Sequence, residues 1–425
     1  MAPKDGETTG GSGRAGLWTP EIQESAPRDL CTDCGISRTD DPGRCGRACQ
    51  FIAPDYPGLE EQVHGRARDM TRGDEKFFGP FKRMVRASLK AKRPGAQWTG
   101  IATRLGERLL ETDAVDAVLA MSHQDDDIWA PKPVIVTEPE AMAQCRGMKM
   151  GYAPLLALLE PALKAGYKRV AVIGIPCQVY ALRALERELG FERIYVIGTP
   201  CSDNTTTEKF HEFLSHITDA PGEVTYFEFR ADYFCEMRFA DGSKREFPFL
   251  MLPISKLPDD FWPTTCRTCV DYTNVLADIT VGYMGGEGEQ WLLVRNDRGQ
   301  ELVDLLGDEL KVGEPGDKGK RGKHVEGFKQ NTEKAAGGMP VRGMPGWLRP
   351  VVGRIMPLVG PRGVEFARAR LEMKAVETII HLRLKAPAKM KNMVPDHVWE
   401  LAKPYGLEPS QDETPREKRR PEAGE

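Results

Sequence analysis

The sequence predicts an α/β protein whose core is a parallel or mixed sheet with flanking helices. Two short apolar runs, residues 170–175 and 194–197, lack polar alternation and are rich in β-branched residues, which is typical of strands buried on both faces. Residues 178–189 between them have apolar side chains at helical spacing. A strand, a helix and a strand in so short a stretch imply a right-handed crossover between parallel strands.

Both predicted strands end in the same Gly-x-Pro-Cys sequence, which places Cys177 after the first and Cys201 after the second. Neighbouring parallel strands end at one edge of a sheet, so the two thiols are expected to approach each other there. Cys177 also begins the predicted helix, whose dipole favours a thiolate. Two buried structural cysteines are the alternative, but the repeat at the same topological position favours a shared site.

The composition is that of an ordinary globular protein. The chain has 425 residues, 40% hydrophobic and 29% charged, enough for two or three domains. The net charge of -4 and the lack of a basic aromatic face give no reason to expect nucleic acid. We expect no transmembrane segment, because no apolar run approaches roughly 18 residues. The N-terminus lacks a signal-like apolar core, so we expect a cytoplasmic protein.

Composition also divides the chain into segments. We expect a disordered leader at 1–28, a cysteine-rich segment at 29–58, a first α/β region at 59–165, a second at 166–311, a mobile segment at 312–345, a helical extension at 346–405 and a disordered tail at 406–425. The basic run 81–92 is predicted to be a solvated helix face or a docking surface for an acidic partner. The apolar cluster within 346–360 is predicted to pack or to dock.

Ten cysteines in a reducing compartment indicate metal or redox chemistry rather than a disulfide framework. Four of them, Cys31, Cys34, Cys45 and Cys49, lie in a polar loop that cannot bury an apolar core, so a metal centre is expected to order it. Four soft ligands suit zinc or an iron-sulfur cluster, and the spacing does not separate the two.

A second set of four thiols comes from separated segments. Cys266 and Cys269 precede a predicted buried strand at 278–281, and they join Cys177 and Cys201. Iron-sulfur clusters are often assembled from dispersed cysteines in this way, whereas small zinc modules use compact knuckles. The two remaining cysteines, Cys145 and Cys235, are expected to be structural.

A glycine-flanked turn at 94–100 opens a predicted helix at 101–110. Backbone N–H groups at such a helix start suit an anion such as a pyrophosphate. The turn contains neither G-x-G-x-x-G nor a P-loop, so a plain loop is the alternative.

These motifs resemble the flavin-containing β-subunit family of deazaflavin-reducing hydrogenases and dehydrogenases. The resemblance lies in GIPCQVYALRAL at 174–185, IGTPCSDN at 197–204 and CRTCVDYTNVLADITVGYMG at 266–285. CTDCG at 31–35, EQVHGRARD at 61–69, GAQWTGI at 95–101 and GPRGVEFAR at 360–368 resemble a branch that acts on chlorophyll pigments. That branch contains the ferredoxin-dependent divinyl chlorophyllide 8-vinyl reductases and the 7-hydroxymethyl chlorophyll a reductases.

The resemblance implies FAD, two 4Fe-4S clusters and reduced ferredoxin as donor, and it favours a homo-oligomer over a monomer. One cluster would bind the N-terminal set Cys31, Cys34, Cys45 and Cys49, and the other Cys177, Cys201, Cys266 and Cys269. Relatives tend to carry a third cysteine directly after CxxCG, where this chain has Ile36 and Ser37, so Cys45 is the expected substitute.

The expected activity is reduction of the 8-vinyl group of 3,8-divinyl (proto)chlorophyllide a to ethyl in (bacterio)chlorophyll biosynthesis. The alternatives are a 7-hydroxymethyl chlorophyll a reductase, an electron-transfer β-subunit of a hydrogenase or dehydrogenase complex, and a zinc-stapled binding protein. A flavin would reconcile a one-electron donor with a two-electron reduction. The expected flavin-site residues are Gly95, Gln97, Trp98, Thr99, Gly100, Asp203, Asn204 and Asn274. His64 and His123 are candidate proton donors, although a lone histidine is more often structural.

Overall fold

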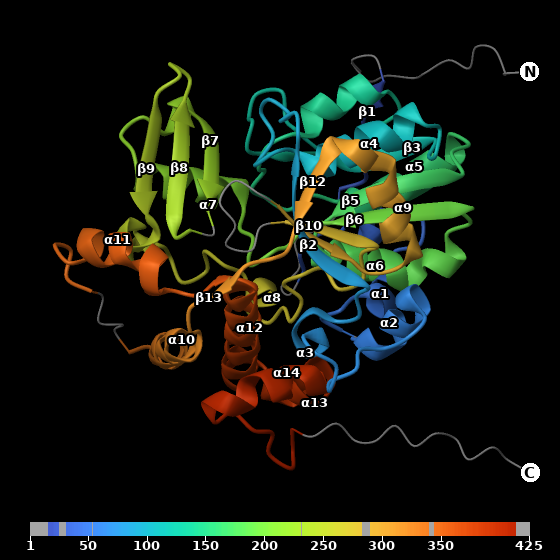
Figure 1. The fold of residues 1–425 in the computed structure, drawn as a ribbon. Coiled ribbons are helices and arrows are strands. Elements are labelled where there is room, and N and C mark those ends of the chain that lie inside the picture. The colour runs from blue at the N-terminus through green and yellow to red at the C-terminus, as the bar shows by residue number, and fades with distance from the viewer. Residues whose placement is uncertain are drawn as a thin grey trace, which may run out of the picture.

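A nine-stranded mixed sheet is the core of the protein, in the strand order β1-β4-β3-β5-β6-β10-β11-β2-β12 (Figure 1). The computed structural model describes residues 16–24, 31–52, 54–230, 232–282, 290–339 and 344–413. The strands of this sheet are β1 (Leu17–Trp18), β2 (Arg83–Leu89), β3 (Ala117–His123), β4 (Pro131–Val136), β5 (Arg169–Gly174), β6 (Arg193–Gly198), β10 (Ile279–Gly282), β11 (Gln290–Val294) and β12 (Leu310–Gly313). The predicted α/β class, with helices flanking a mixed sheet, is confirmed.

The two strands that end in Gly-x-Pro-Cys are neighbours. β5 and β6 pair in parallel, with Gly174 opposite Gly198, and helix α6 (Pro176–Leu185) joins them. β3 and β10 flank this pair, also in parallel. The carboxyl ends of these four strands therefore lie at one edge of the sheet, as expected for a crossover of this kind.

Both faces of the sheet are covered, which is why its strands appear in the sequence as continuous apolar runs. Along β5, Val170 and Val172 pack in one core while Ala171 packs in the other, and all three are fully buried. The first core lies under α6, α1 (Arg44–Ala48), α2 (Tyr56–His64) and α5 (Leu159–Lys164). The second core lies under α4 (Ile101–Glu111) and α9 (Asp297–Leu306). Successive side chains of a strand point to opposite faces.

A separate antiparallel sheet stands beside the core (Figure 1). It consists of β7 (Val224–Phe229), β8 (Phe234–Phe239) and β9 (Lys244–Pro248), with α7 (Thr207–Ser215) packed on it. Phe227 meets Phe210 and Phe213 at ring-centroid distances of 6.1 and 5.8 Å. The sequence analysis did not predict this aromatic unit.

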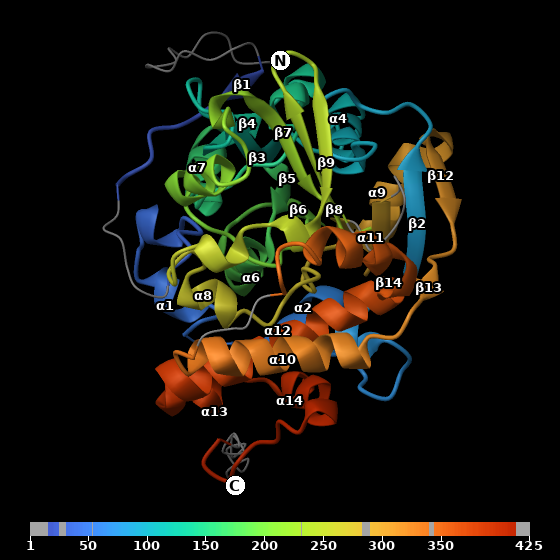
Figure 2. The same cartoon turned by 90° about the vertical axis from the view of Figure 1, so that its left-hand side faces the viewer.

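The C-terminal part of the chain adds a layer of helices (Figure 2). Its elements are α10 (Gly322–Ala336), α11 (Arg349–Val359), α12 (Val364–Lys385), α13 (Met390–Met393) and α14 (Asp396–Ala402), with the short strands β13 (Asp317–Lys318) and β14 (Arg362–Gly363) pairing between them. Two short helices of the core, α3 (Glu75–Phe78) and α8 (Thr264–Arg267), contact α14 and α12. On α11, Val351, Ile355 and Leu358 are exposed to solvent. No helix among these described elements is long and apolar enough to cross a bilayer.

Two expectations about local structure are wrong. The basic run predicted as a helix face is β2, because Val85, Ala87 and Leu89 alternate with more exposed residues and pack into the core. The segment 312–345, expected to be mobile, holds the helix α10, which packs on α12 with Val325 fully buried. In both cases a small number of apolar residues at the correct period outweighs a strongly polar composition.

The two terminal segments are ordered over the parts that the structure describes. In the expected leader, Leu17 and Trp18 pair with β4, and residues 1–15 and 25–28 lie outside the described ranges. In the expected tail, Leu407 is buried and Arg383 donates to Glu413 at 2.8 Å. Residues 414–425 lie outside the described ranges.

Candidate functional site

Four cysteine side chains meet at the carboxyl edge of the sheet. Cys177 stands in the first turn of α6, Cys201 follows β6, Cys266 is in α8 and Cys269 follows it. All four line one small cavity, and Thr32, Phe51 and Tyr152 complete its wall. The structure thus brings together the second cysteine set that the sequence predicted from three separate segments.

Burial makes this set of thiols hard to ionise without a compensating cation. It raises the pKa of Cys177, Cys266 and Cys269 to about 12 each. It raises the pKa of Cys201 further, and the negative charges that its three neighbours would carry add to the effect. A bound cationic iron centre removes that penalty, since its ligands are thiolates. Four soft donors in one dry cavity therefore fit an iron-sulfur cluster chemically.

Asn274 joins the two Gly-x-Pro-Cys turns rather than facing the cavities. Its Nδ2 donates to the carbonyl oxygens of Gly174 at 2.8 Å and of Thr199 at 3.3 Å. A Cβ on Gly198 would lie 2.7 Å from the Asn274 side chain and 2.6 Å from Ala277, so only glycine fits there. Asn274 thus holds the strand ends at a fixed spacing, and it is not among the residues that line the large cavity described below.

A lysine from the C-terminal helices reaches this cysteine set. Lys374 of α12 donates to Asp203 at 2.9 Å, to Glu377 at 2.8 Å and to the carbonyl oxygen of Cys266 at 2.7 Å. Its side chain is 4% exposed. The sequence analysis missed this lysine, because nothing in the local pattern of α12 indicates that its side chain crosses to a loop far earlier in the chain.

The N-terminal cysteines form a second set beside the first. Cys31 and Cys34 lie in the loop before α1, Cys45 lies in α1 and Cys49 directly follows it. Burial raises the pKa of Cys34, and repulsion from Cys177, Cys45 and Cys49 raises it further. Cys34 therefore lies within electrostatic reach of thiols of both sets. Thr32 and Phe51 also line the cavity of the first set, so the two sets are neighbours.

The donor geometry differs from that of a single-ion site. Within the described ranges, no three His, Cys, Asp or Glu side chains lie close enough together to hold one metal ion. Ile36, where relatives tend to carry a cysteine, is 1% exposed and packs in the core under α6. Cys45 is the N-terminal thiol beside Cys34 and Cys49 that could take the place of that cysteine.

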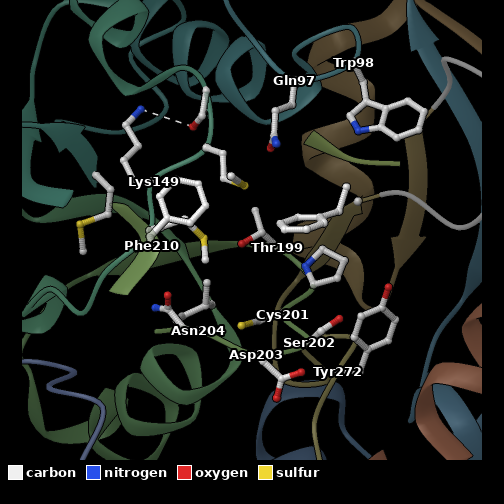
Figure 3. A pocket seen from close by; sticks show the side chains of 18 of the residues that line it. Gln97, Trp98, Lys149, Thr199, Cys201, Ser202, Asp203, Asn204, Phe210 and Tyr272 are labelled. Atoms are coloured by element: carbon white, nitrogen blue, oxygen red, sulfur yellow. Dashed lines mark hydrogen bonds between the residues drawn. The ribbon is translucent and has the colours of Figure 1, made fainter. Parts of the chain in front are cut away.

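A large cavity of about 740 Å³ opens at the same edge of the sheet (Figure 3). Cys201, Asp203 and Tyr272 line it on the side of the cysteine set. An aromatic wall from α7, the small sheet and the loop after it lines another part: Phe210, Phe213, Phe229, Phe249, Phe261 and Trp262. A volume of this size suits a cofactor or a ligand as large as a drug.

Five of the eight predicted flavin-site residues line this cavity, namely Gln97, Trp98, Gly100, Asp203 and Asn204. Gly95, Thr99 and Asn274 do not. Thr99 is buried, accepts from the backbone N–H of Leu89 at 3.1 Å and donates to Gln290 at 3.2 Å. Gln290 also accepts from the backbone N–H of Ile101 at 3.0 Å, so one of the first N–H groups of α4 already has a partner.

Neither predicted proton donor lies at the cavity. The ring of His64 on α2 bonds the carbonyl oxygen of Val275 at 2.8 Å, and burial lowers its pKa to about 3. His123 ends β3, where its ring bonds the carbonyl oxygen of Gln124 at 2.8 Å. His64 would be neutral at pH 7 and is a structural residue. Sequence reasoning chose both because they sit near polar turns, which does not specify the direction of a side chain.

Lys149 is a cavity residue that the sequence analysis missed. It lines the cavity and donates to the carbonyl oxygens of Arg146 and Gly147, and Figure 3 shows it beside Phe210. Burial lowers its pKa to about 8. Lys149 is therefore a group able to release a proton near neutral pH inside a mostly apolar cavity.

Two descriptions of one protein family match the chain. The N-terminal part of the coenzyme F420 hydrogenase/dehydrogenase beta subunit matches residues 84–160, and its C-terminal part matches residues 167–318. Among the solved structures, a chain of the F420-reducing [NiFe] hydrogenase complex from Methanosarcina barkeri superposes with a TM-score of 0.53. It covers 71% of this chain and 92% of its own length at 20% identity, a level that supports the shared fold alone.

Three curated relatives are similar over most of the chain. An uncharacterised protein of Nostoc, all1601, is 35% identical over 381 residues, which is 89% of this chain and 94% of that protein. The chloroplastic 7-hydroxymethyl chlorophyll a reductase of Oryza sativa is 34% identical over 89% of this chain and 83% of its own length. One component of the F(420)H(2) dehydrogenase of Methanosarcina mazei is 27% identical over 69% and 87%. On these similarities, the chain belongs to the coenzyme F420 hydrogenase/dehydrogenase β-subunit family and to its chlorophyll reductase branch.

Proposed function

We propose that the protein reduces a peripheral substituent of a chlorophyll-type pigment, with reduced ferredoxin as the electron donor, two 4Fe-4S clusters as the relay and FAD at the end of that relay. The observation that carries the proposal is the large cavity, because it adjoins the buried four-cysteine set on one side and an aromatic wall on the other. The similarity to a 7-hydroxymethyl chlorophyll a reductase over 89% of the chain supports the class of substrate.

The residues that would hold the redox groups follow from the geometry. Cys177, Cys201, Cys266 and Cys269 would ligate one cluster, and Cys31, Cys34, Cys45 and Cys49 the other. Gln97, Trp98, Gly100, Asp203 and Asn204 would contact the flavin. When bound, the clusters would supply one-electron transfer and the flavin would turn pairs of single electrons into a hydride.

The other cavity residues would handle the pigment and the proton. A flat apolar macrocycle packs well against Phe210, Phe213 and Phe261, and this contact would exclude water from the reacting substituent. The Lys149 ammonium group would hold a proton inside the cavity, because its pKa of about 8 keeps it mostly protonated at pH 7. Two electrons and two protons convert a vinyl group to an ethyl group.

The 8-vinyl group of a divinyl (proto)chlorophyllide is the first candidate substituent. The second is a 7-hydroxymethyl group, which the name of the rice relative favours. Two electrons and two protons would convert that group to a methyl group and water. The two reactions need the same electrons, so the donor chemistry does not separate them.

Anaerobically purified protein, reduced ferredoxin and each pigment in turn test this proposal, with products identified by chromatography and mass. We expect the divinyl pigment to gain two hydrogen atoms. Conversion of the hydroxymethyl pigment alone would overturn the vinyl assignment, and conversion of neither pigment would overturn the proposal of a pigment reductase. Reduced coenzyme F420 as the donor provides the comparison with the hydrogenase subunits.

A further inference from the structure

The C-terminal helices place a cation in the wall of the large cavity. Arg370 of α12 lines the cavity together with Phe366 of the same helix, Met356 of α11 and His324 of α10. The match to the family ends at residue 318, so these four side chains belong to a part of the chain that the general family pattern does not include.

The other arginines along α12 show how unusual Arg370 is. Arg368 donates to Asp74 at 2.7 Å and to Asp317 at 2.9 Å, and Arg383 donates to Glu413 at 2.8 Å. For Arg370, the contact found among the described residues is with the face of Tyr272, where the guanidinium carbon lies 6.0 Å from the ring centroid. Its hydrogen-bond donors are thus available to a ligand.

The polar groups near Arg370 are already engaged or are neutral. Asp203, which also lines the cavity, accepts from Lys374 at 2.9 Å. The hydroxyl of Tyr233 donates to the carbonyl oxygen of Pro361 at 2.7 Å. Burial, assisted by the charge of Arg370, lowers the pKa of His324, so that histidine is uncharged at pH 7. Arg370 therefore brings a net positive charge into an otherwise apolar part of the cavity.

We infer that Arg370 binds a free carboxylate carried by the pigment, so that the enzyme selects free-acid pigments over their esters. This inference rests on the proposed function and deepens it. A guanidinium group matches a carboxylate with two parallel hydrogen bonds and stacks on an aromatic ring at the same time, as Arg370 does on Tyr272. A chlorophyllide carries one free propionate, whereas in chlorophyll that propionate is esterified. The arginine thus favours the chlorophyllide as the substrate.

Binding of the pigment to the oxidised protein, without any electron donor, tests the inference. The probes are chlorophyllide a and its methyl ester, followed by quenching of tryptophan fluorescence. We expect the wild-type protein to bind the acid about 10- to 100-fold more tightly than the ester, the range for a charged hydrogen-bonded contact. Arg370→Gln should lose that preference and bind the ester as the wild type does, and Arg370→Lys should keep part of it.

A matched control and the flavin content separate the possible causes. Arg354→Gln removes an exposed arginine of α11 that does not line the cavity, and it should leave both affinities unchanged. The flavin absorbance per chain should be the same in wild type and Arg370→Gln. Loss of flavin in Arg370→Gln alone would make Arg370 a cofactor contact and overturn the inference.

The wild-type protein alone already provides a decisive comparison, even if the variants fold poorly. Equal affinity for the acid and the ester would overturn the role of Arg370 and leave the proposed function standing. Absence of binding to either pigment would overturn the proposed function itself.

Discussion

The two cysteine sets differ in what holds them in place. Cys177 and Cys201 follow adjacent strands of the central sheet, and Lys374 and Asn274 bind the loops around them. The N-terminal set is carried by a polar loop and the five-residue helix α1. A site built on strand ends keeps its geometry without a ligand, whereas a loop depends more on the group it binds. The comparison therefore separates a rigid set at the sheet edge from a ligand-dependent set on a loop.

Loss of the rigid set should have the largest effect. Cys201→Ser should remove about four of the roughly eight irons expected for two four-iron clusters and lower the pigment reduction rate at least about 100-fold with any donor. Iron analysis and turnover measurements check this. Cys235→Ala, in the core of the small sheet, is the control and should keep its iron. Full iron content in Cys201→Ser would remove that cysteine from the ligand set.

Loss of the buried cation beside the rigid set should be the largest effect on stability. Lys374→Met leaves Asp203 and Glu377 without their shared partner, which should cost about 3–5 kcal/mol of unfolding free energy. Denaturant unfolding of both proteins measures the difference. Lys403→Met, at an exposed lysine nearby in the chain, should change stability by less than about 0.5 kcal/mol. Equal stability of Lys374→Met and wild type would show that the pair is solvated rather than buried.

Loss of the N-terminal set should depend on the electron donor. Cys31→Ser should also lose about four irons, and its ferredoxin-dependent rate should fall about tenfold or more. With a small-molecule reductant that reaches the cavity, much of the rate should return. Parallel assays with the two donors measure this ratio. An equal loss with both donors would contradict the assignment of the N-terminal set to the outer part of the relay.

The smallest effect concerns the proton side of the cavity. Lys149 has a pKa near 8 because burial disfavours its charge, so its proton is present below that pH and lost above it. The rate should therefore fall as the pH rises through about 8, and Lys149→Met should be slower by about tenfold and lack this step. A pH profile of both proteins measures it. An unchanged step in the variant would assign the titration to another group.

Much of the site edge could be predicted because it rests on local patterns. Two buried strands with identical Gly-x-Pro-Cys ends led to a parallel pair, and the structure confirms that β5 and β6 are neighbours. The basic strand β2 was mistaken for a helix, since its arginines obscure a short alternation of Val85, Ala87 and Leu89. The choice of His64 as a proton donor misled for a different reason, because its ring points into the core and away from the cavity.

The sequence alone determined the fold class, the positions of the eight cysteines and the sheet edge at which four of them meet. These depend on hydrophobic period and on residues next to each other in the chain. Only the tertiary structure revealed Lys149, Lys374 and Arg370, together with the aromatic wall of the cavity. Each of these side chains acts across long sequence separations, and its direction is set by packing between elements that no local pattern encodes.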